Sequence, residues 1–281
     1  MTGNHTTNQR RWQPQHFTRY RQIAMVLVKY RLAELMRPLG LDGFARLRWI
    51  PSNPWHKEAY TQSQRVRMAL EELGTTFVKV GQILSTRTDI LPSDFTQELS
   101  KLQSSLSPIP VEVVEKVIRE ELGRPVREIF ASFDPNPLGV ASIGQAHAAT
   151  LRDGREVVVK SRKPGVVEQV QIDLEILRRQ AVSAARRGKG MQDYNLPGIV
   201  EEISDTLMAE LDYIREGHSA EHFAQFFRED PLIHIPKILW EYTTARVITL
   251  ERIKGIGILD VPALDAAGFN RKELAKRSAS I

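Results

Sequence analysis

The 281-residue sequence contains no cysteine, so it can form neither a disulfide framework nor a cysteine-ligated zinc site. Long apolar runs are also lacking. Near the start of the chain the longest purely apolar run is Ile23–Val28, far short of the roughly 20 residues that a membrane-spanning helix needs. Residues 1–14 are polar and lack the apolar centre of a signal peptide. We therefore expect a cytoplasmic or membrane-peripheral protein.

A surplus of positive charge is lacking outside the first 50 residues. This segment carries nine Lys or Arg against two acidic residues, whereas the remainder has 30 basic and 32 acidic residues. A local basic surplus indicates contact with an anionic partner, such as a membrane surface, at this end of the chain. The surplus is not accompanied by interleaved aromatic residues or a known nucleic-acid motif, so we expect no nucleic-acid partner.

The basic segment contains one strong helical pattern. We expect residues 1–18 to be disordered and a helix to run from Arg19 to Met36, with Ile23, Val26 and Leu27 on one face. Such a basic amphipathic helix either lies on an anionic membrane or packs on the rest of the protein with its arginines in solvent. The apolar stripe is poor in Trp and Phe, which favours packing.

Further along the chain, helical periodicity alternates with strand-like runs. Glycine and proline punctuate the helices, and the dipeptide Asp153-Gly154 indicates a β-hairpin. Asp134–Pro137 is predicted to be a turn. The expected helices are Gln62–Gly74, Val111–Leu122 with Gly123 as its cap, Val166–Arg187, and one helix from Pro197 to Phe227. The expected strands are Ala141–Leu151, Arg155–Ser161, His234–Glu241 and Ala245–Leu250.

The order of these elements is that of the small lobe of a protein kinase. A small-residue loop between strands is followed by a hairpin, then by Lys160 at the end of a strand, and then by a helix with glutamates. In that arrangement the lysine holds nucleotide phosphates and a helix glutamate pairs with it. Each element alone is weak evidence, because a run such as Val157–Lys160 equally fits a buried strand that ends on a solvated lysine.

Three motifs in this order resemble those of the UbiB family, the aarF-domain atypical kinases. Lys79–Gln82 matches the Lys-x-Gly-Gln signature, and Pro137–His147 is similar to the alanine-rich loop that replaces the kinase glycine loop. Glu210–Glu216 resembles the Glu-x-Asp motif followed by the helix glutamate. The resemblance extends from about Arg19 to the C-terminus. It implies an α+β fold, with a kinase-like small lobe of antiparallel sheet and helices and a helical N-terminal extension.

The resemblance also implies roles for individual residues. Lys160 and Glu216 would form the phosphate-binding pair, and Lys79 would be a third residue of the catalytic machinery. The extension would fold over the nucleotide as a lid, held by Glu210 and Asp212. The residues implied to cover ATP or ADP are Gly139, Val140, Ala141, Ser142 and Ile143, and those of the lid are Lys79, Gly81, Gln82, Glu210 and Asp212. A plain stabilising salt bridge between Lys79 and Glu210 is the alternative. Members of this family are linked to ATP hydrolysis and quinone-lipid biosynthesis, so quinone-biosynthesis proteins or lipids are the implied partners.

The sequence departs from the family pattern in two ways. Gly139 and Val140 stand where the family has alanines, so the preference between ATP and ADP stays open. The family's His-x-Asp-Pro-His-Pro-x-Asn run is absent, and so is Asp-Phe-Gly. Mg²⁺ is expected for the family, but these motifs carry its ligands, and we predict no metal site in this chain.

The missing motifs predict that most of the large lobe is absent. The expected regions are a disordered N-terminus (1–18), a helical extension (19–123), a small lobe (124–254) and the start of a truncated large lobe (255–281). Two interpretations follow. The chain is either a catalytically incomplete member of the family or a non-enzymatic, membrane-peripheral binding or regulatory module.

Overall fold

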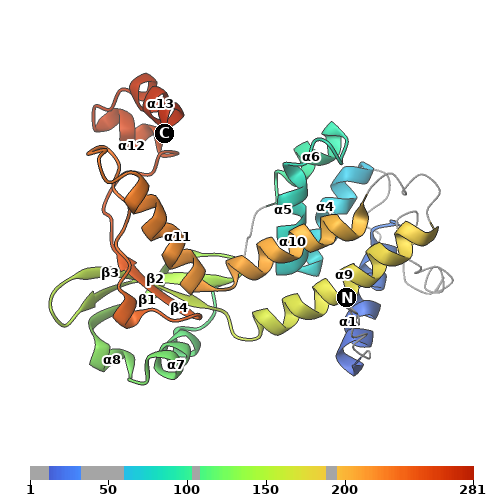
Figure 1. The fold of residues 1–281 in the computed structure, drawn as a ribbon, viewed down its shortest axis with the longest axis horizontal. Helices are drawn as coiled ribbons and strands as arrows, with labels where there is room; N and C mark the ends of the chain where they lie inside the picture. Colours follow the sequence, from blue (N-terminus) through green and yellow to red (C-terminus); the bar gives the residue numbers. More distant parts are fainter. Residues whose placement is uncertain (1–12, 33–59, 103–107, 188–194) are drawn as a thin grey trace, which may run out of the picture.

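The computed structural model describes residues 13–32, 60–102, 108–187 and 195–281 (Figure 1). It is an α+β protein with one four-stranded antiparallel sheet, as the sequence predicts. The helices are α1 (Pro14–Lys29), α4 (Gln62–Leu73), α5 (Thr75–Ser85), α6 (Ser93–Leu99), α7 (Val111–Leu122), α8 (Val126–Ile129), α9 (Val166–Arg187), α10 (Leu196–Glu210), α11 (Tyr213–Phe226), α12 (Val261–Ala266) and α13 (Arg271–Ser280). The strands are β1 (Phe130–Val140), β2 (Gly144–Leu151), β3 (Glu156–Arg162) and β4 (Val247–Glu251), and a short 3-10 turn, η2, spans Trp240–Tyr242.

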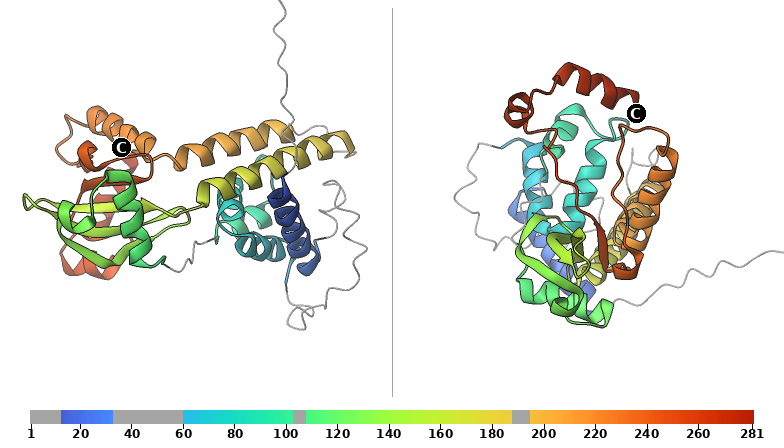
Figure 2. Two further views of the ribbon diagram at one scale, coloured as in Figure 1. Left: turned by 90° about the horizontal axis from the view of Figure 1, so that it is seen from below. Right: turned by 90° about the vertical axis from the view of Figure 1, so that its left-hand side faces the viewer.

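The molecule has a sheet part and a helical part. In Figures 1 and 2, the sheet with α7, α8 and α11 lies at one end, and α1, α4, α5 and α6 lie at the other. The long helices α9 and α10 run side by side from the sheet to the helical part, where α9 packs on α1 and α10 packs on α5. The extension is therefore joined to the sheet through two long helices that follow β3.

The sheet has the strand order β1-β2-β3-β4. The predicted hairpin at Asp153-Gly154 joins β2 to β3, and Gly154 has the positive φ of 89° that favours glycine there. Helix α7 covers one face of the sheet, with Val117 and Ile118 packed in a core that includes Val157 and Val159 of β3. This packing places α7 with the sheet, whereas the sequence assigned residues up to 123 to the extension.

Two strand predictions need correction. Asp134–Pro137 is not a separate turn but lies inside β1, where the pairing with β2 shifts register between Phe133 and Pro137. Because β1 is an edge strand, it can accommodate prolines and a bulge without losing ladder bonds on its other side. His234–Glu241 is not a strand. It contributes only an isolated bridge between Ile238 and Leu250, and η2 occupies its end.

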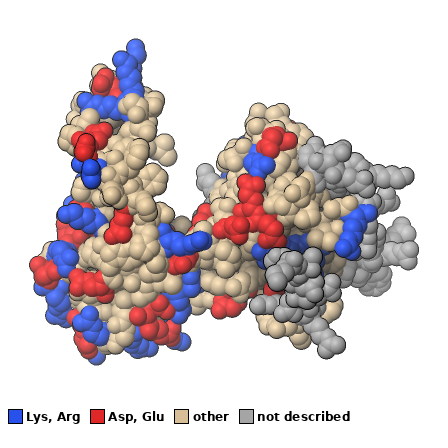
Figure 3. Space-filling model, in the orientation of Figure 1, with Lys and Arg blue, Asp and Glu red and all other residues tan. Residues whose placement is uncertain are grey.

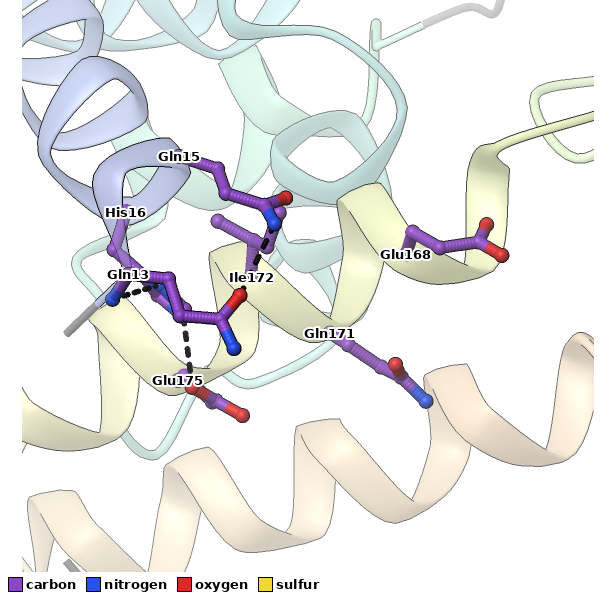
Figure 4. Close-up of a pocket in the computed structure, with 7 residues that line it drawn as sticks. All are labelled: Gln13, Gln15, His16, Glu168, Gln171, Ile172 and Glu175. Atoms are coloured by element: carbon purple, nitrogen blue, oxygen red, sulfur yellow. Dashed lines mark hydrogen bonds and ion pairs between the residues drawn. The ribbon is translucent and has the colours of Figure 1, made fainter. Parts of the chain in front are cut away.

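Helix α1 begins at Pro14, earlier than the predicted Arg19. The reason is a local cap: the backbone N–H of Gln13 donates to the His16 ring, and the other ring nitrogen of His16 lies 2.8 Å from Glu175 of α9 (Figure 4). Residues 1–12 and 33–36, also covered by the sequence predictions, lie outside the described residues. The apolar stripe of α1, including Ile23 and Leu27, is buried against α4 and α9. The stripe is therefore used for packing within the protein.

The predicted helix from Pro197 to Phe227 is two helices, broken at Leu211 and Asp212 between α10 and α11. After β4 the chain leaves the sheet, and α12 and α13 lie apart from the helical part (Figure 1). In this tail the apolar residues Ile256, Ile258, Leu259 and Val261 are exposed, whereas Leu264 is buried.

Charges on the described surface are mixed. On the face drawn in Figure 3, Lys and Arg side chains are interspersed with Asp and Glu over the sheet part. Within the described residues, no helix combines the length and the apolar character needed to cross a membrane.

Candidate functional site

Lys160 and Glu216 form a close ion pair on the face of the sheet opposite α7. The alternation of β3 buries Val157 and Val159 toward α7 and points Lys160 to the other side. The Lys160 Nζ lies 2.7 Å from Oε2 and 2.9 Å from Oε1 of Glu216. The two side chains are 29% and 42% exposed, so the ammonium group is held in place while it stays accessible to a ligand.

Asp212 sets the position of Glu216. Its carboxylate accepts a hydrogen bond of 3.0 Å from the backbone N–H of Ile214 and so caps the N-terminus of α11. Glu216 lies in the first turn of that helix, where a carboxylate is favoured by the helix dipole. The sequence assigned Asp212 to the lid contact. In the structure it instead caps the helix that carries Glu216.

The loop between β1 and β2 is closed by a tight turn, in which the Ala141 N–H donates to the Gly144 carbonyl at 2.8 Å. Gly139 and Val140 still belong to β1 and pair with β2. Ser142 and Ile143 are buried, and Ile143 packs in the core that includes Val80. Of the five residues predicted to cover a nucleotide, Gly139 and Ala141 are exposed, whereas Ser142 and Ile143 face the extension.

Helix α5 makes one polar contact with this loop and another with the end of α10. Thr75, the first residue of α5, donates its hydroxyl hydrogen to the Ser142 carbonyl at 3.1 Å. One turn later in α5, the Lys79 Nζ lies 2.8 Å from Oε2 of Glu210, the last residue of α10. The Lys79–Glu210 contact is the ion pair that the sequence predicts. The Thr75–Ser142 contact was not predicted, because it joins a side chain to a backbone carbonyl.

Gly81 and Gln82 lie on α5 but serve its packing. A Cβ atom at Gly81 would lie 2.3 Å from Leu102 and 2.8 Å from Leu70, so glycine allows close approach there. The Gln82 side-chain amide donates to the Leu102 carbonyl at 3.0 Å. Among the described residues, these contacts fix α5 to the segment after α6, and neither residue is paired with Lys160 or Glu216.

Two further residues of the site, Tyr213 and Gly144, lie inside the motifs but were given no role from the sequence. Tyr213 is the first residue of α11 and is fully buried beneath Lys160. Burial and the nearby Glu216 carboxylate raise the pKa of Tyr213 well above its usual range, so its phenol stays neutral. The only local signal for Tyr213 is its place directly after the capping residue Asp212.

The donors of the site suit phosphate groups better than a metal ion. Lys160 supplies an ammonium group, and Gly139 and Ala141 are small, exposed residues. In contrast, no group of three or more His, Asp or Glu side chains within the described ranges could hold a metal. The described residues of the site therefore suit a phosphate group.

Comparison with known proteins identifies the family. The ABC1 atypical kinase-like domain matches residues 101–281. The chain belongs to this family. Relatives named "Probable protein kinase UbiB" include those of Marinobacter nauticus, 40% identical over 269 residues, and of Xylella fastidiosa, 40% identical over 263 residues. An uncharacterised protein of Synechocystis sp. is 43% identical over 218 residues, covering 78% of this chain and 37% of its own length.

The two UbiB relatives are longer than this chain. The matches cover 92% and 91% of this chain but 48% and 47% of those proteins, so the chain spans about half the length of these relatives. A solved structure of Rv3197 from Mycobacterium tuberculosis in complex with erythromycin matches with a TM-score of 0.47 and 31% identity, covering 67% of this chain and 47% of that one.

Proposed function

We propose that this chain is the nucleotide-binding part of a UbiB-type atypical kinase or ATPase, with Lys160 as the residue that contacts the phosphates of ATP or ADP. The observation that carries the proposal is the Lys160–Glu216 ion pair beside the loop turn. A lysine held in this way presents a fixed positive charge, which is what a nucleotide phosphate needs. Membership of the ABC1 family supports this assignment.

The lid is the second part of the proposal. Lys79 and Glu210 hold α5 against the end of α10, next to the loop that Thr75 also contacts. A helical extension in this position would cover the nucleotide and limit access for a protein substrate. This favours hydrolysis of ATP, or transfer to a small acceptor, over phosphorylation of proteins.

We also propose the role in quinone-lipid biosynthesis that the resemblance implies, and Mg²⁺ as the ion that accompanies the nucleotide. Within the described residues, no group of three or more His, Asp or Glu side chains could hold that ion, so its ligands are not assigned to residues of the described ranges. Contact with an anionic membrane would use the exposed face of α1, which includes Arg21, since the apolar face is buried.

Thermal unfolding of the chain with and without Mg-ATP and Mg-ADP tests the nucleotide proposal. A ligand that binds only the folded state stabilises it by about 2.7 kcal/mol at 100 times its Kd. We expect a nucleotide-dependent rise in Tm that Lys160→Ala abolishes and the exposed control Lys116→Ala retains. A rise of equal size in Lys160→Ala would refute the role of Lys160, and no rise in the unmodified chain would refute nucleotide binding by this part alone.

A further inference from the structure

Tyr213 contacts Lys160 with the face of its ring. The Lys160 Nζ lies 4.7 Å from the ring centroid, and a cation within about 6 Å of an aromatic face is attracted by the electron density of the ring. The ammonium group is therefore held by the Glu216 carboxylate and by the Tyr213 ring together. Because the ring is fully buried, its position is fixed by the surrounding core.

The hydroxyl end of the same side chain reaches the base of the loop. A Cβ atom at Gly144 would lie 2.4 Å from Tyr213 Oη and 2.5 Å from the Ser161 carbonyl oxygen. Gly144 is the residue whose carbonyl closes the loop turn with Ala141. One aromatic side chain thus touches the lysine with its face and the closing residue of the loop with its tip.

The Tyr213 hydroxyl has no hydrogen-bond partner among the described residues although it is buried. A buried hydroxyl without a partner costs stability, so its hydrogen bonding does not explain why this side chain lies here. The span of the side chain does explain it, since the ring face contacts Lys160 and the hydroxyl end lies beside Gly144.

We propose that Tyr213 is a positioning residue that fixes Lys160 relative to the loop turn at Gly144. The consequence of this positioning for ligand binding rests on the proposed nucleotide function. The phosphates would bind between a lysine and a loop whose separation is already fixed by Tyr213. The positioning itself concerns the protein without ligand and can be measured there.

The experiment compares the acylation rate of the Lys160 amine, followed by mass spectrometry of its peptide, in four variants of the full chain. Tyr213→Phe keeps the ring, and Tyr213→Leu removes it. Glu216→Gln removes the ionic partner as a positive control. Tyr242→Leu truncates another tyrosine, which packs in the core between α7 and the sheet. The peptide that contains Lys116 serves as the reference for general reactivity.

We expect Tyr213→Phe to react like the unmodified chain and Tyr213→Leu to react about fivefold faster at Lys160, which corresponds to a cation–π contact of about 1 kcal/mol. Tyr242→Leu should lower stability and leave the Lys160 rate unchanged. An unchanged rate in Tyr213→Leu, or an equal increase in Tyr242→Leu, overturns the proposal.

If Tyr213→Leu does not fold, a fluorinated phenylalanine at position 213 keeps the ring shape and weakens the negative charge of its face. The Lys160 rate should then rise, and an unchanged rate would count against the proposal. Nucleotide affinity is measured in parallel on the same variants. If the acylation rate of Lys160 responds as expected but neither the unmodified chain nor any variant binds nucleotide, the positioning role of Tyr213 is supported and the proposed nucleotide function is refuted.

Discussion

The ion pair between Lys79 and Glu210 should make a measurable contribution to holding α5 against α10. The perturbations are Lys79→Met and Glu210→Gln, alone and combined, which remove each charge while keeping much of the side-chain volume. The two atoms lie 2.8 Å apart, and the side chains are 24% and 37% exposed. This partial burial makes the pair stronger than a fully solvated one.

The magnitude follows from opposing terms. Two unit charges about 4 Å apart attract by about 4 kcal/mol at an effective dielectric constant of about 20. Loss of hydration and of side-chain freedom offsets most of this attraction, and measured surface pairs contribute about 0.2–1 kcal/mol. We expect a coupling free energy near the upper end, about 1 kcal/mol, that falls to about half in 1 M salt because screening shortens to about 3 Å.

Urea unfolding of the four proteins measures the coupling as a double-mutant cycle. The matched control is the Lys116–Glu120 pair on α7, whose atoms lie 3.9 Å apart and whose side chains are 65% and 44% exposed. That pair should couple by about 0.3 kcal/mol. A Lys79–Glu210 coupling no larger than the control, or one that does not respond to salt, would refute the reasoning.

Two further predictions concern packing and pH. Gly217→Ala would bring a Cβ to 2.6 Å from the Trp240 ring. Overpacking costs about 1–3 kcal/mol, which should outweigh the helix-propensity gain of about 1 kcal/mol and lower the stability in urea. The control Gly139→Ala, whose Cβ would have nothing within 4 Å, should leave urea unfolding unchanged. Hydrogen bonds from Lys101 and Arg67 lower the pKa of Glu98 in the folded protein. The ionised Glu98 carboxylate therefore stabilises the folded state at pH values above its pKa in the unfolded chain, and this stabilisation is lost as the pH falls through the lower pKa of the folded state. Glu98→Gln should therefore unfold more easily than the unmodified chain at pH 7 and lose less stability than that chain between about pH 5 and pH 3. Parallel curves of unfolding free energy against pH for the two proteins would contradict this.

The helices with continuous periodicity were predictable because their signals are local. Val111–Leu122 has an apolar face, and Gly123 follows in the left-handed conformation that ends a helix. The Val166–Arg187 pattern likewise gave the bounds of α9.

The break between α10 and α11 was missed because no glycine or proline marks it. Its signal is Asp212, a preferred capping residue, with Glu216 in the first turn that follows. The bulge in β1 could not be predicted in the same way. Whether Asp134–Pro137 forms a turn or a bulge depends on whether the strand lies at an edge, which is decided by tertiary structure.

The separation in sequence explains which parts of the site could be predicted. Lys160 and Glu216 are 56 residues apart, and their pairing was predicted only because the motifs resemble a known family. Thr75 and Ser142 are 67 residues apart and meet through a backbone carbonyl, which leaves no pattern in side-chain type. From the sequence, Tyr213 looks like any aromatic residue of a core. Its contact with Lys160 depends on how α11 packs on the sheet, which is decided by tertiary structure.

Three carboxylates around the α10–α11 break connect the lid to the lysine. Glu210 ends α10 and holds Lys79 of the extension, Asp212 caps α11, and Glu216 in the first turn of α11 holds Lys160. Only one residue, Leu211, separates the lid contact at Glu210 from the helix cap at Asp212. If α5 acts as the proposed lid, we expect a displacement of α5 that pulls on Glu210 to act on Asp212 and, through the first turn of α11, on the Glu216 carboxylate that holds Lys160. The short break between α10 and α11 would then couple the position of the proposed lid to the position of Lys160.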